Sequence, residues 1–307
     1  MLLEKKATAG IISPMTEVLD LNPAQFRAII LSHGWFSLKP FSVGMDPPRL
    51  RVPYVLPGGK GVFEVSVKDG CCELKAVHGK PEDCSDAAQN CLSLDVSPEA
   101  LYKPAGKKWG WLAANNMGRF LRSPTLFEDC CKVICSTNTT FDRTETMVER
   151  MVDKFGARVG RHHAFPEPGA LLKAGEAVLK AETGCGFRAK YILGVAERTL
   201  SEPELFLGKG WRVLENGPFY DMLTASKGIG PASANYLSLV YWKPKGFNID
   251  SYVVRRCAEI WGISPAEIPS FLAKRYKVFG VHAPIAFWFD ITKHWHRNNT
   301  DISAMEW

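Results

Sequence analysis

The hydrophobic and polar positions follow two different periods along the chain, and the period changes near residue 97. Segments between about residues 26 and 95 are rich in β-branched and aromatic side chains, and residues 49–56 alternate with period two. Residues 60–77 form two further alternating runs around Asp69-Gly70, a pair typical of a tight hairpin turn. We therefore predict an antiparallel sheet with one wet face from segments 26–38, 49–56 and 60–77. The polar stretch 83–97 is predicted to be irregular.

Beyond residue 97 the apolar positions recur every three or four residues, as in amphipathic helices. Ser123 is expected as the N-cap of one helix with Pro124 in its first turn, and Gly156 as the end of another. Strands first and helices afterwards favour an α+β fold. We predict an antiparallel β-sheet domain over residues 1–115 and a helical domain over 116–307. The expected helices are 97–115, 123–138, 141–156, 187–200, 219–228, 231–242, 251–262 and 283–295.

The composition is that of an ordinary globular protein, with 46% hydrophobic and 23% charged residues among 307. This balance excludes a disordered chain, a collagen-like chain and a coiled coil. No apolar run approaches the roughly 20 residues that a membrane span needs, and the first residues lack the pattern of a secretory signal. We therefore expect no membrane partner and no secretion. The expected location is the cytoplasm, at the nucleoid in a bacterium, or the nucleus in a eukaryote.

Nine cysteines are scattered along the chain without CxxC spacing. An odd number without a secretory signal favours reduced thiols over a disulfide framework, and the spacing argues against a zinc ribbon or a redox pair. His162-His163 and the pair His294 and His296 are candidates for a metal enzyme. They lack carboxylates or cysteines at ligand spacing, so we expect surface histidines and no metal site.

The net charge is +6, from 38 basic and 32 acidic residues, and it favours a polyanionic partner only slightly. Its location matters more. Residues 227–231, Lys-Gly-Ile-Gly-Pro, join two helical patterns at about 218–242. Two glycines around one apolar residue predict a tight turn with uncovered backbone amides, and the proline suits the start of the next helix. Exposed amides at a helix N-terminus bind anions, so this turn is a candidate phosphate site.

Asp250 follows this turn and precedes the helical segment 251–262. Its simplest role is the N-cap of that helix. Taken together, however, the turn and Asp250 resemble the helix-hairpin-helix, the Gly/Pro-rich loop and the aspartate of the DNA glycosylase superfamily. Segments 119–156, 186–197 and 282–290 extend the resemblance toward the branch of 8-oxoguanine and 3-methyladenine DNA glycosylases. The resemblance covers about residues 119–290, and the strand-rich N-terminal part fits the family's sheet domain, which is similar to the TATA-binding protein.

The resemblance implies roles for individual residues. Asp250 matches the catalytic aspartate, and Gly228 and Gly230 match the hairpin glycines that hold a DNA phosphate. Asn138 and Arg143 match the loop that fills the hole left by the flipped base and contacts its orphaned partner. Phe187 and Arg188 match the wedge aromatic and the arginine that reads the opposite base. The DNA-binding set expected from this resemblance is Lys227, Gly228, Ile229, Gly230, Ala232, Asn138, Arg143, Phe187 and Arg188.

Two departures from the family change the expected chemistry. Bifunctional members carry a lysine nucleophile where this chain has Ala232, so a monofunctional enzyme that uses water is expected. Only Cys257 follows the aspartate, so the four-cysteine iron–sulfur cluster of some members is excluded. The resemblance leaves open a structural alkali ion held by hairpin carbonyls. No other cofactor is expected.

The expected base pocket also departs from the family. Ile285 replaces the glutamine that reads the base edge in 8-oxoguanine enzymes, Tyr236 and Tyr252 line the pocket, and Phe289 is the expected stacking aromatic. An aromatic pocket without that amide suits an electron-poor alkylated base or a bulkier modified one. Ordinary core packing is the alternative role for these aromatics.

The function implied is that of a monofunctional DNA glycosylase acting as a monomer on double-stranded DNA. It flips a damaged or modified base out of the duplex, and Asp250 stabilises the oxocarbenium-like sugar and orients a water. The alternative is a non-catalytic helix-hairpin-helix module that only binds DNA. Alkylated, oxidised, deaminated and hypermodified bases all remain open as substrates.

Overall fold

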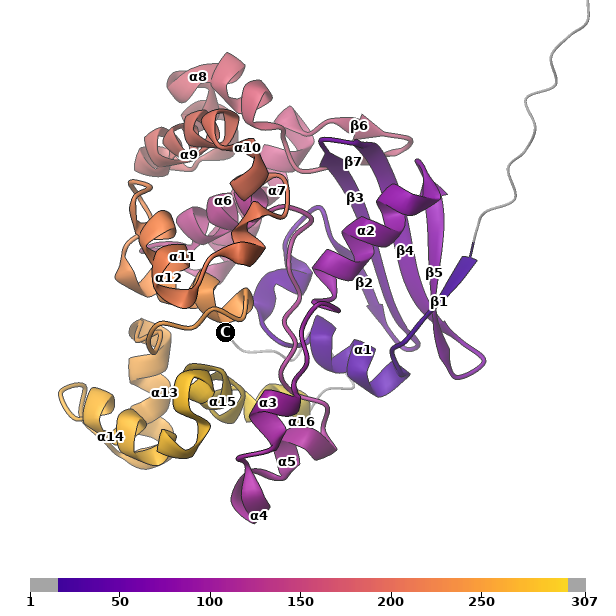
Figure 1. The fold of residues 1–307 in the computed structure, drawn as a ribbon. Helices are drawn as coiled ribbons and strands as arrows, with labels where there is room; N and C mark the ends of the chain where they lie inside the picture. The colour runs from indigo at the N-terminus through magenta and orange to yellow at the C-terminus, as the bar shows by residue number, and fades with distance from the viewer. Residues whose placement is uncertain (1–15, 298–307) are drawn as a thin grey trace, which may run out of the picture.

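The computed structural model describes residues 16–297, which form an α+β fold with a sheet followed by helices (Figure 1). Five antiparallel strands lie in the spatial order β1-β5-β4-β3-β2. The turn between β4 and β5 is at Asp69 and Gly70, which both have positive φ, so the predicted hairpin is confirmed. The strands are β1 (Thr16–Leu19), β2 (Ser42–Met45), β3 (Pro48–Leu56), β4 (Gly59–Lys68) and β5 (Cys71–His78).

One face of the sheet is buried, as the alternating pattern predicts. The other face is polar except where Val55 and Val62 form a small apolar cluster with Val159 and Ala164. Leu50 and Val52 of β3 stand opposite Val65 and Phe63 of β4, and all four are fully buried. The helices α1 (Pro23–Ile30) and α2 (Pro81–Cys91) pack on the sheet. On β3 and β4, the outer face carries the ion pair between Arg51 and Glu64.

The prediction of a strand over 26–38 is wrong. This segment contains most of α1 and then the 3-10 helix η1 (Gly34–Ser37). A capping box starts α1, because Asn22 accepts from the Gln25 amide at 2.9 Å and Gln25 accepts from the Asn22 amide at 3.0 Å. Phe26, Ile29 and Ile30 then lie on one buried helical face. The capping box therefore favours a helix here, although the β-branched residues of this segment favour a strand.

Two further local predictions need correction. Residues 83–97 are not irregular throughout, because α2 continues to Cys91 with Cys84, Ala88 and Cys91 buried at helical spacing. The helix α6 (Leu126–Ser136) is capped by Thr125, whose hydroxyl accepts from the Glu128 amide at 3.2 Å, and not by Ser123. The strands β1 and β2 were not predicted either.

The remaining secondary structure of the described chain is helical, except for a small hairpin of β6 (Arg158–Val159) and β7 (His162–His163) beside β4. None of the described helices has both the length and the apolar content for a membrane span. The remaining elements are α3 (Glu99–Tyr102), α4 (Gly106–Trp109), α5 (Trp111–Ala114), α7 (Phe141–Phe155), α8 (Pro168–Thr183), η2 (Gly186–Arg188), α9 (Ala189–Ser201), α10 (Pro203–Phe206), η3 (Gly210–Val213), α11 (Asn216–Thr224), α12 (Pro231–Val240), α13 (Ser251–Trp261), α14 (Ile268–Arg275), η4 (Lys277–His282), α15 (Ala283–Ile291) and α16 (Lys293–Arg297).

The boundary at residue 115 stays a prediction. The short helices before it pack toward the C-terminal helices: α3 contacts η4, and the Trp109 ring lies 5.0 Å from the ring of Tyr276. We call residues 16–122 the sheet lobe and residues 126–297 the helical lobe. One apolar core is continuous through both lobes.

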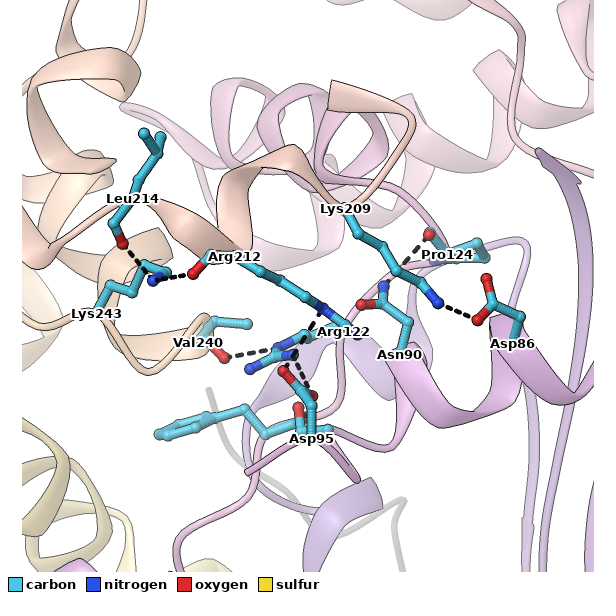
Figure 2. A network of polar contacts seen from close by, with 12 residues as sticks. Asp86, Asn90, Asp95, Arg122, Pro124, Lys209, Arg212, Leu214, Val240 and Lys243 are labelled. Carbon is cyan, nitrogen blue, oxygen red and sulfur yellow. Dashed lines mark hydrogen bonds and ion pairs between the residues drawn. The ribbon is translucent and has the colours of Figure 1, made fainter. Parts of the chain in front are cut away.

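A buried polar network joins the two lobes (Figure 2). The guanidinium of Arg122 is fully buried between the rings of Trp211 and Tyr241, at 5.1 and 5.0 Å from their centroids. It donates to Asp95 at 2.8 Å and to the Val240 carbonyl at 3.1 Å. We call this set the Arg122 network. Its ring and carbonyl partners are in the helical lobe, and Asp95 follows α2, so it fixes the end of α12 against the sheet lobe.

Candidate functional site

Asp250 is the N-cap of α13, so its predicted structural role is confirmed. Its Oδ1 accepts from the Val253 amide at 2.8 Å, and its Oδ2 accepts from the side-chain amide of Asn248 at 3.1 Å. The carboxylate is only partly buried. A carboxylate has about four lone-pair positions and these two bonds use two of them, so Asp250 retains acceptor capacity.

The turn that precedes Asp250 connects α11 and α12, which pack against each other as the two helices of a hairpin. Gly228 has φ of +96°, and a Cβ at this position would lie 2.5 Å from Tyr191. The buried Ile229 holds the turn in the core, while Lys227 and Gly230 are exposed. Gly228 is therefore required by the fold itself.

Gly230 differs from Gly228, because its φ is −80° and a Cβ there would meet nothing within 4 Å. It is the N-cap of α12, and no side chain caps the helix. The first amides of α12 are therefore left without a side-chain partner beside an open surface and the exposed Lys227. This is the geometry of an anion site at a helix N-terminus.

The segment with the predicted wedge lies beside this turn. Phe187 is 49% exposed, and its ring makes an edge contact at 6.2 Å with Tyr191, the residue beneath Gly228. Arg188 donates to the carbonyls of Thr137 and Asn138. The structure thus brings together three segments predicted separately: the loop at Asn138, η2, and the hairpin turn.

Arg188 is 7% exposed, and these bonds to the backbone direct it at the loop. Asn138 is exposed and has φ of +48°, a conformation that the bonds from Arg188 help to hold. Arg188 therefore positions Asn138 in this structure. Reading of the opposite base by Arg188 stays a prediction.

Arg143 lies on α7 and lines a cavity of about 230 Å³ beside the loop. Arg150, one heptad further along the same helix, lines it too, and so does Arg188. Three guanidinium groups without a carboxylate in the lining make this cavity basic, so it suits an anion or the acceptor edge of a base.

Rings from both lobes surround Tyr236, which α12 presents near Asp250. Burial and then the negative charge of Asp250 raise the pKa of the Tyr236 phenol. Its ring lies 5.8 Å from Trp35 and 5.5 Å from Trp288. Tyr252 lies 6.5 Å from Trp288 on another side. We call the whole set the aromatic cluster: His33, Trp35, Tyr236, Tyr252, Trp288 and Trp295.

Ile285 and Phe289, the other two residues expected at the base pocket, are fully buried. The Phe289 ring packs on Phe120 at 5.1 Å. Neither side chain presents a free face in the described structure, and Trp288 of the same helix contacts the two tyrosines instead. Residues 283–289 of α15 are buried without exception, so the sequence pattern did not reveal which side of this helix faces Tyr236.

Sequence reasoning missed His33 and Trp35, because it assigned their segment to a strand. His33 is fully buried, and burial lowers its pKa to about 4. Its Nδ1 is 2.6 Å from the Tyr236 hydroxyl and its Nε2 is 2.7 Å from the Leu121 carbonyl. The one available signal was a histidine within an aromatic, apolar run, and that signal is weak.

The residues considered for other chemistry lie apart from Asp250 in the sequence. Ala232 lies on the first turn of α12, and Lys227 before the turn is exposed. In the part of the chain that the structure describes, no three His, Cys, Asp or Glu side chains group around a common point that could hold a metal ion. His162 and His163 lie on β7, and His294 contacts Arg256 at 3.2 Å. The side chain of His296 lies outside the described residues.

Comparisons with known proteins agree with this arrangement. Residues 131–278 match the profile of the HhH-GPD superfamily base excision DNA repair proteins. The chain is 26% identical over 242 residues to the N-glycosylase/DNA lyase OGG1 of Arabidopsis thaliana, a match that covers 67% of this chain and 63% of that protein. The chain therefore spans less than two thirds of this curated relative.

Two solved structures share the fold. A 3-methyladenine DNA glycosylase from Archaeoglobus fulgidus superposes with a TM-score of 0.70 at 20% identity, over 92% of this chain and 99% of that one. The 8-oxoguanine glycosylase/lyase of Clostridium acetobutylicum, bound to double-stranded DNA with cytosine opposite 8-oxoguanine, gives 0.62 at 17% identity, over 91% and 98%. The predicted order of a sheet followed by a helix-hairpin-helix region is confirmed.

Proposed function

Because residues 131–278 match the HhH-GPD superfamily of base excision DNA repair proteins, we propose that this protein is a DNA glycosylase. It removes a damaged or modified base from double-stranded DNA by hydrolysis of the N-glycosidic bond. The observation that carries the proposal is Asp250: a partly exposed carboxylate behind an uncapped helix-hairpin-helix turn and beside the aromatic cluster.

In this proposal, Asp250 supplies negative charge where the sugar becomes positive. Cleavage of the N-glycosidic bond passes through an oxocarbenium-like sugar, and a preorganised carboxylate stabilises that charge and orients the attacking water. The amides of Val253 and Asn248 hold the two oxygens, so the group needs little rearrangement during the reaction.

The DNA contacts follow from the surface around the turn. The free amides of α12 and the exposed Lys227 bind a phosphate of the strand that carries the target base. Phe187 fills the gap left in the duplex, and Asn138 lies beside it on the loop that Arg188 holds. The basic cavity of Arg143 and Arg150 receives the other strand.

The chemistry proposed is monofunctional, because Ala232 stands where a lysine nucleophile is expected. The aromatic cluster favours stacking on an alkylated or bulky modified base, and Ile285 stands where 8-oxoguanine enzymes carry the glutamine that reads the base edge.

We also propose that the protein acts as a monomer without an iron–sulfur cluster, at the nucleoid or in the nucleus. An alkali ion at the hairpin carbonyls is a further proposal, testable by the potassium dependence of DNA binding.

The deciding experiment is a panel of duplexes, each with a single alkylated, oxidised, deaminated or hypermodified base, followed by alkali to cut abasic sites. Wild-type protein should leave strands that break only after alkali, and borohydride should trap no covalent complex. Asp250→Asn keeps an N-cap oxygen but removes the charge, so excision should fall by about two to three orders of magnitude while DNA binding persists.

Each readout can contradict one part of the proposal. Full activity of Asp250→Asn would reduce Asp250 to a helix cap. A trapped adduct would mean that a lysine elsewhere attacks the sugar. Binding without excision of any duplex would favour the non-catalytic DNA-binding module. The fastest cleavage on 8-oxoguanine would contradict the proposed preference for other bases.

A further inference from the structure

A short chain of hydrogen bonds leads from the sheet lobe into the aromatic cluster. The Leu121 carbonyl lies 2.7 Å from Nε2 of His33, and Nδ1 of the same ring lies 2.6 Å from the hydroxyl of Tyr236. Because a carbonyl only accepts, Nε2 carries the proton. Burial lowers the pKa of His33 to about 4, so at neutral pH the ring has one proton and Nδ1 has none.

The direction of the second bond follows from this tautomer. A bare Nδ1 can only accept, so Tyr236 donates its hydroxyl proton to His33. A phenol has a single proton, and this one is directed away from the rest of the cluster. The oxygen of Tyr236 therefore offers only lone pairs to any further partner.

The surroundings hold His33 in this orientation. The ring is fully buried, 5.1 Å from Trp35 and 6.0 Å from Phe120. The preceding residue is bonded twice: Ser32 accepts from the Leu121 amide through its hydroxyl at 3.0 Å, and from Nε1 of Trp288 through its carbonyl at 2.8 Å. A rotated imidazole would lose the Leu121 bond inside the core, at the cost of an unpaired buried carbonyl.

Tyr236, in contrast, keeps part of its surface accessible, and it lies close enough to Asp250 for the two groups to interact electrostatically. We propose that His33 fixes the hydrogen-bond polarity of Tyr236, so that its oxygen meets an extruded base only as an acceptor and selects a base edge that carries an N–H donor. This inference rests on the proposed function. It assigns a positioning role to a residue of the sheet lobe and narrows the substrate class to bases with an amino group or a ring N–H at that edge.

The test uses pairs of duplexes whose target bases differ by one exocyclic amino group. 7-Methyladenine is compared with 7-methylpurine, and 3-methyladenine with 3-methylpurine, because the two purine members carry no N–H donor on any edge. The wild-type protein should process the amino member of at least one pair about tenfold faster or more, because the other member leaves the Tyr236 oxygen without its donor. Ratios within about threefold for every pair would overturn the inference.

Variants of His33 test whether this residue sets the direction of the Tyr236 hydrogen bond or only stabilises the fold. His33→Leu removes the acceptor and frees the Tyr236 proton, so the preference for the amino base should collapse toward one. His33→Asn places an amide oxygen near the position of Nδ1 and should restore most of the preference. Tyr236→Phe should abolish it. Tyr102→Phe is the matched control, because it also removes one hydroxyl that donates to a partner, here the Met117 carbonyl at 2.6 Å, outside the cluster. Loss of the preference in this control would overturn the assignment.

The tautomer of His33 can be measured by spectroscopy without any catalytic assay. In ¹⁵N spectra at neutral pH, His33 should show a protonated Nε2 and an unprotonated Nδ1, and the opposite tautomer would overturn the inference. If no duplex is excised, the proposed function fails, and the same pairs are compared by their affinity for Asp250→Asn. Equal affinities within each pair would then overturn the inference as well, whereas tighter binding of the amino member would support it.

Discussion

Burial shifts the pKa values of individual side chains in this protein toward the neutral form. The shift is downward for a histidine and upward for an aspartate. Burial lowers the pKa of His33 to about 4, with the positive charge of Lys132 a smaller contribution. Burial raises the pKa of Asp129 to about 7, although the Tyr241 hydroxyl donates to it at 2.7 Å. In the unfolded chain both groups return to ordinary values, so each makes the free energy of unfolding depend on pH.

The two dependences have opposite signs. His33 binds a proton more readily in the unfolded chain, so its contribution is full above pH 6.5 and disappears as the pH falls toward 4. Asp129 binds a proton more readily in the folded chain, so its contribution is full below about pH 4 and disappears as the pH rises through 7. The contributions of these two groups should therefore largely cancel each other between pH 4 and 7.

His33→Leu isolates one of these contributions. The difference in unfolding free energy between wild type and this variant should shrink by roughly 3 kcal/mol as the pH falls from 7 to 4, since a pKa unit corresponds to about 1.4 kcal/mol. Urea unfolding at several pH values measures it. A difference that stays constant with pH would mean that His33 titrates normally in the folded protein.

At the scale of elements, the hairpin turn contains two glycines that the structure uses for different purposes. Gly228→Ala places a Cβ 2.5 Å from Tyr191 at a φ of +96°, so it should lower stability by about 1–3 kcal/mol and weaken DNA binding as a consequence. Gly230→Ala meets nothing within 4 Å and keeps an ordinary φ, so its melting temperature should stay near that of wild type.

DNA affinity then distinguishes the two glycines. If the backbone at Gly230 approaches a phosphate, Gly230→Ala should weaken binding severalfold in a fully folded protein. Melting curves and DNA titrations at one salt concentration measure both effects. Unchanged DNA affinity in Gly230→Ala would place the phosphate elsewhere.

At Phe187 and Arg188, effects on lesion excision can likewise be distinguished from effects on stability. Phe187→Ala removes an exposed ring and should reduce lesion excision about tenfold with little change in melting temperature, since stacking on a base is worth about 1–3 kcal/mol. Val178→Ala, at 47% exposure, is the control for loss of a comparable apolar surface. Arg188→Ala should differ from both and lower the melting temperature, because it releases the carbonyls of Thr137 and Asn138. A normal melting temperature for Arg188→Ala would contradict its structural role.

Elements with local signals were predictable, and those that depend on distant partners were not. The Asp69-Gly70 hairpin, the turn at 227–231 and the N-cap at Asp250 each depend on a few neighbouring residues. The helix α1 was missed because its aromatic and β-branched residues suggest a strand, while the deciding cap at Asn22 lies outside the apolar run. The two lobes supply the rings around Tyr236 from positions about 200 residues apart, which no local pattern records.

At the scale of the whole molecule, the Arg122 network determines how the lobes are held together. Asp95→Ala removes the carboxylate partner of a guanidinium with no exposed side-chain surface and should lower the unfolding free energy by about 3–5 kcal/mol. Asp86→Ala breaks the exposed ion pair with Lys209 and should cost less than about 1 kcal/mol. Chemical unfolding measures both. Adding Arg122→Met to Asp95→Ala should recover part of the loss, and a further loss would contradict the importance of the unpaired charge.

The hydrogen bond from Trp288 to the Ser32 carbonyl joins residues 256 positions apart. During synthesis on a ribosome, at about 5–20 residues per second, roughly 13–50 s separate the appearance of these two residues. Throughout that interval His33 and Trp35 lack Trp288 as a partner, and for most of it they also lack Tyr236. The nascent chain therefore carries uncovered aromatic surface for most of its synthesis, which makes the sheet lobe a natural substrate for chaperones until α15 emerges.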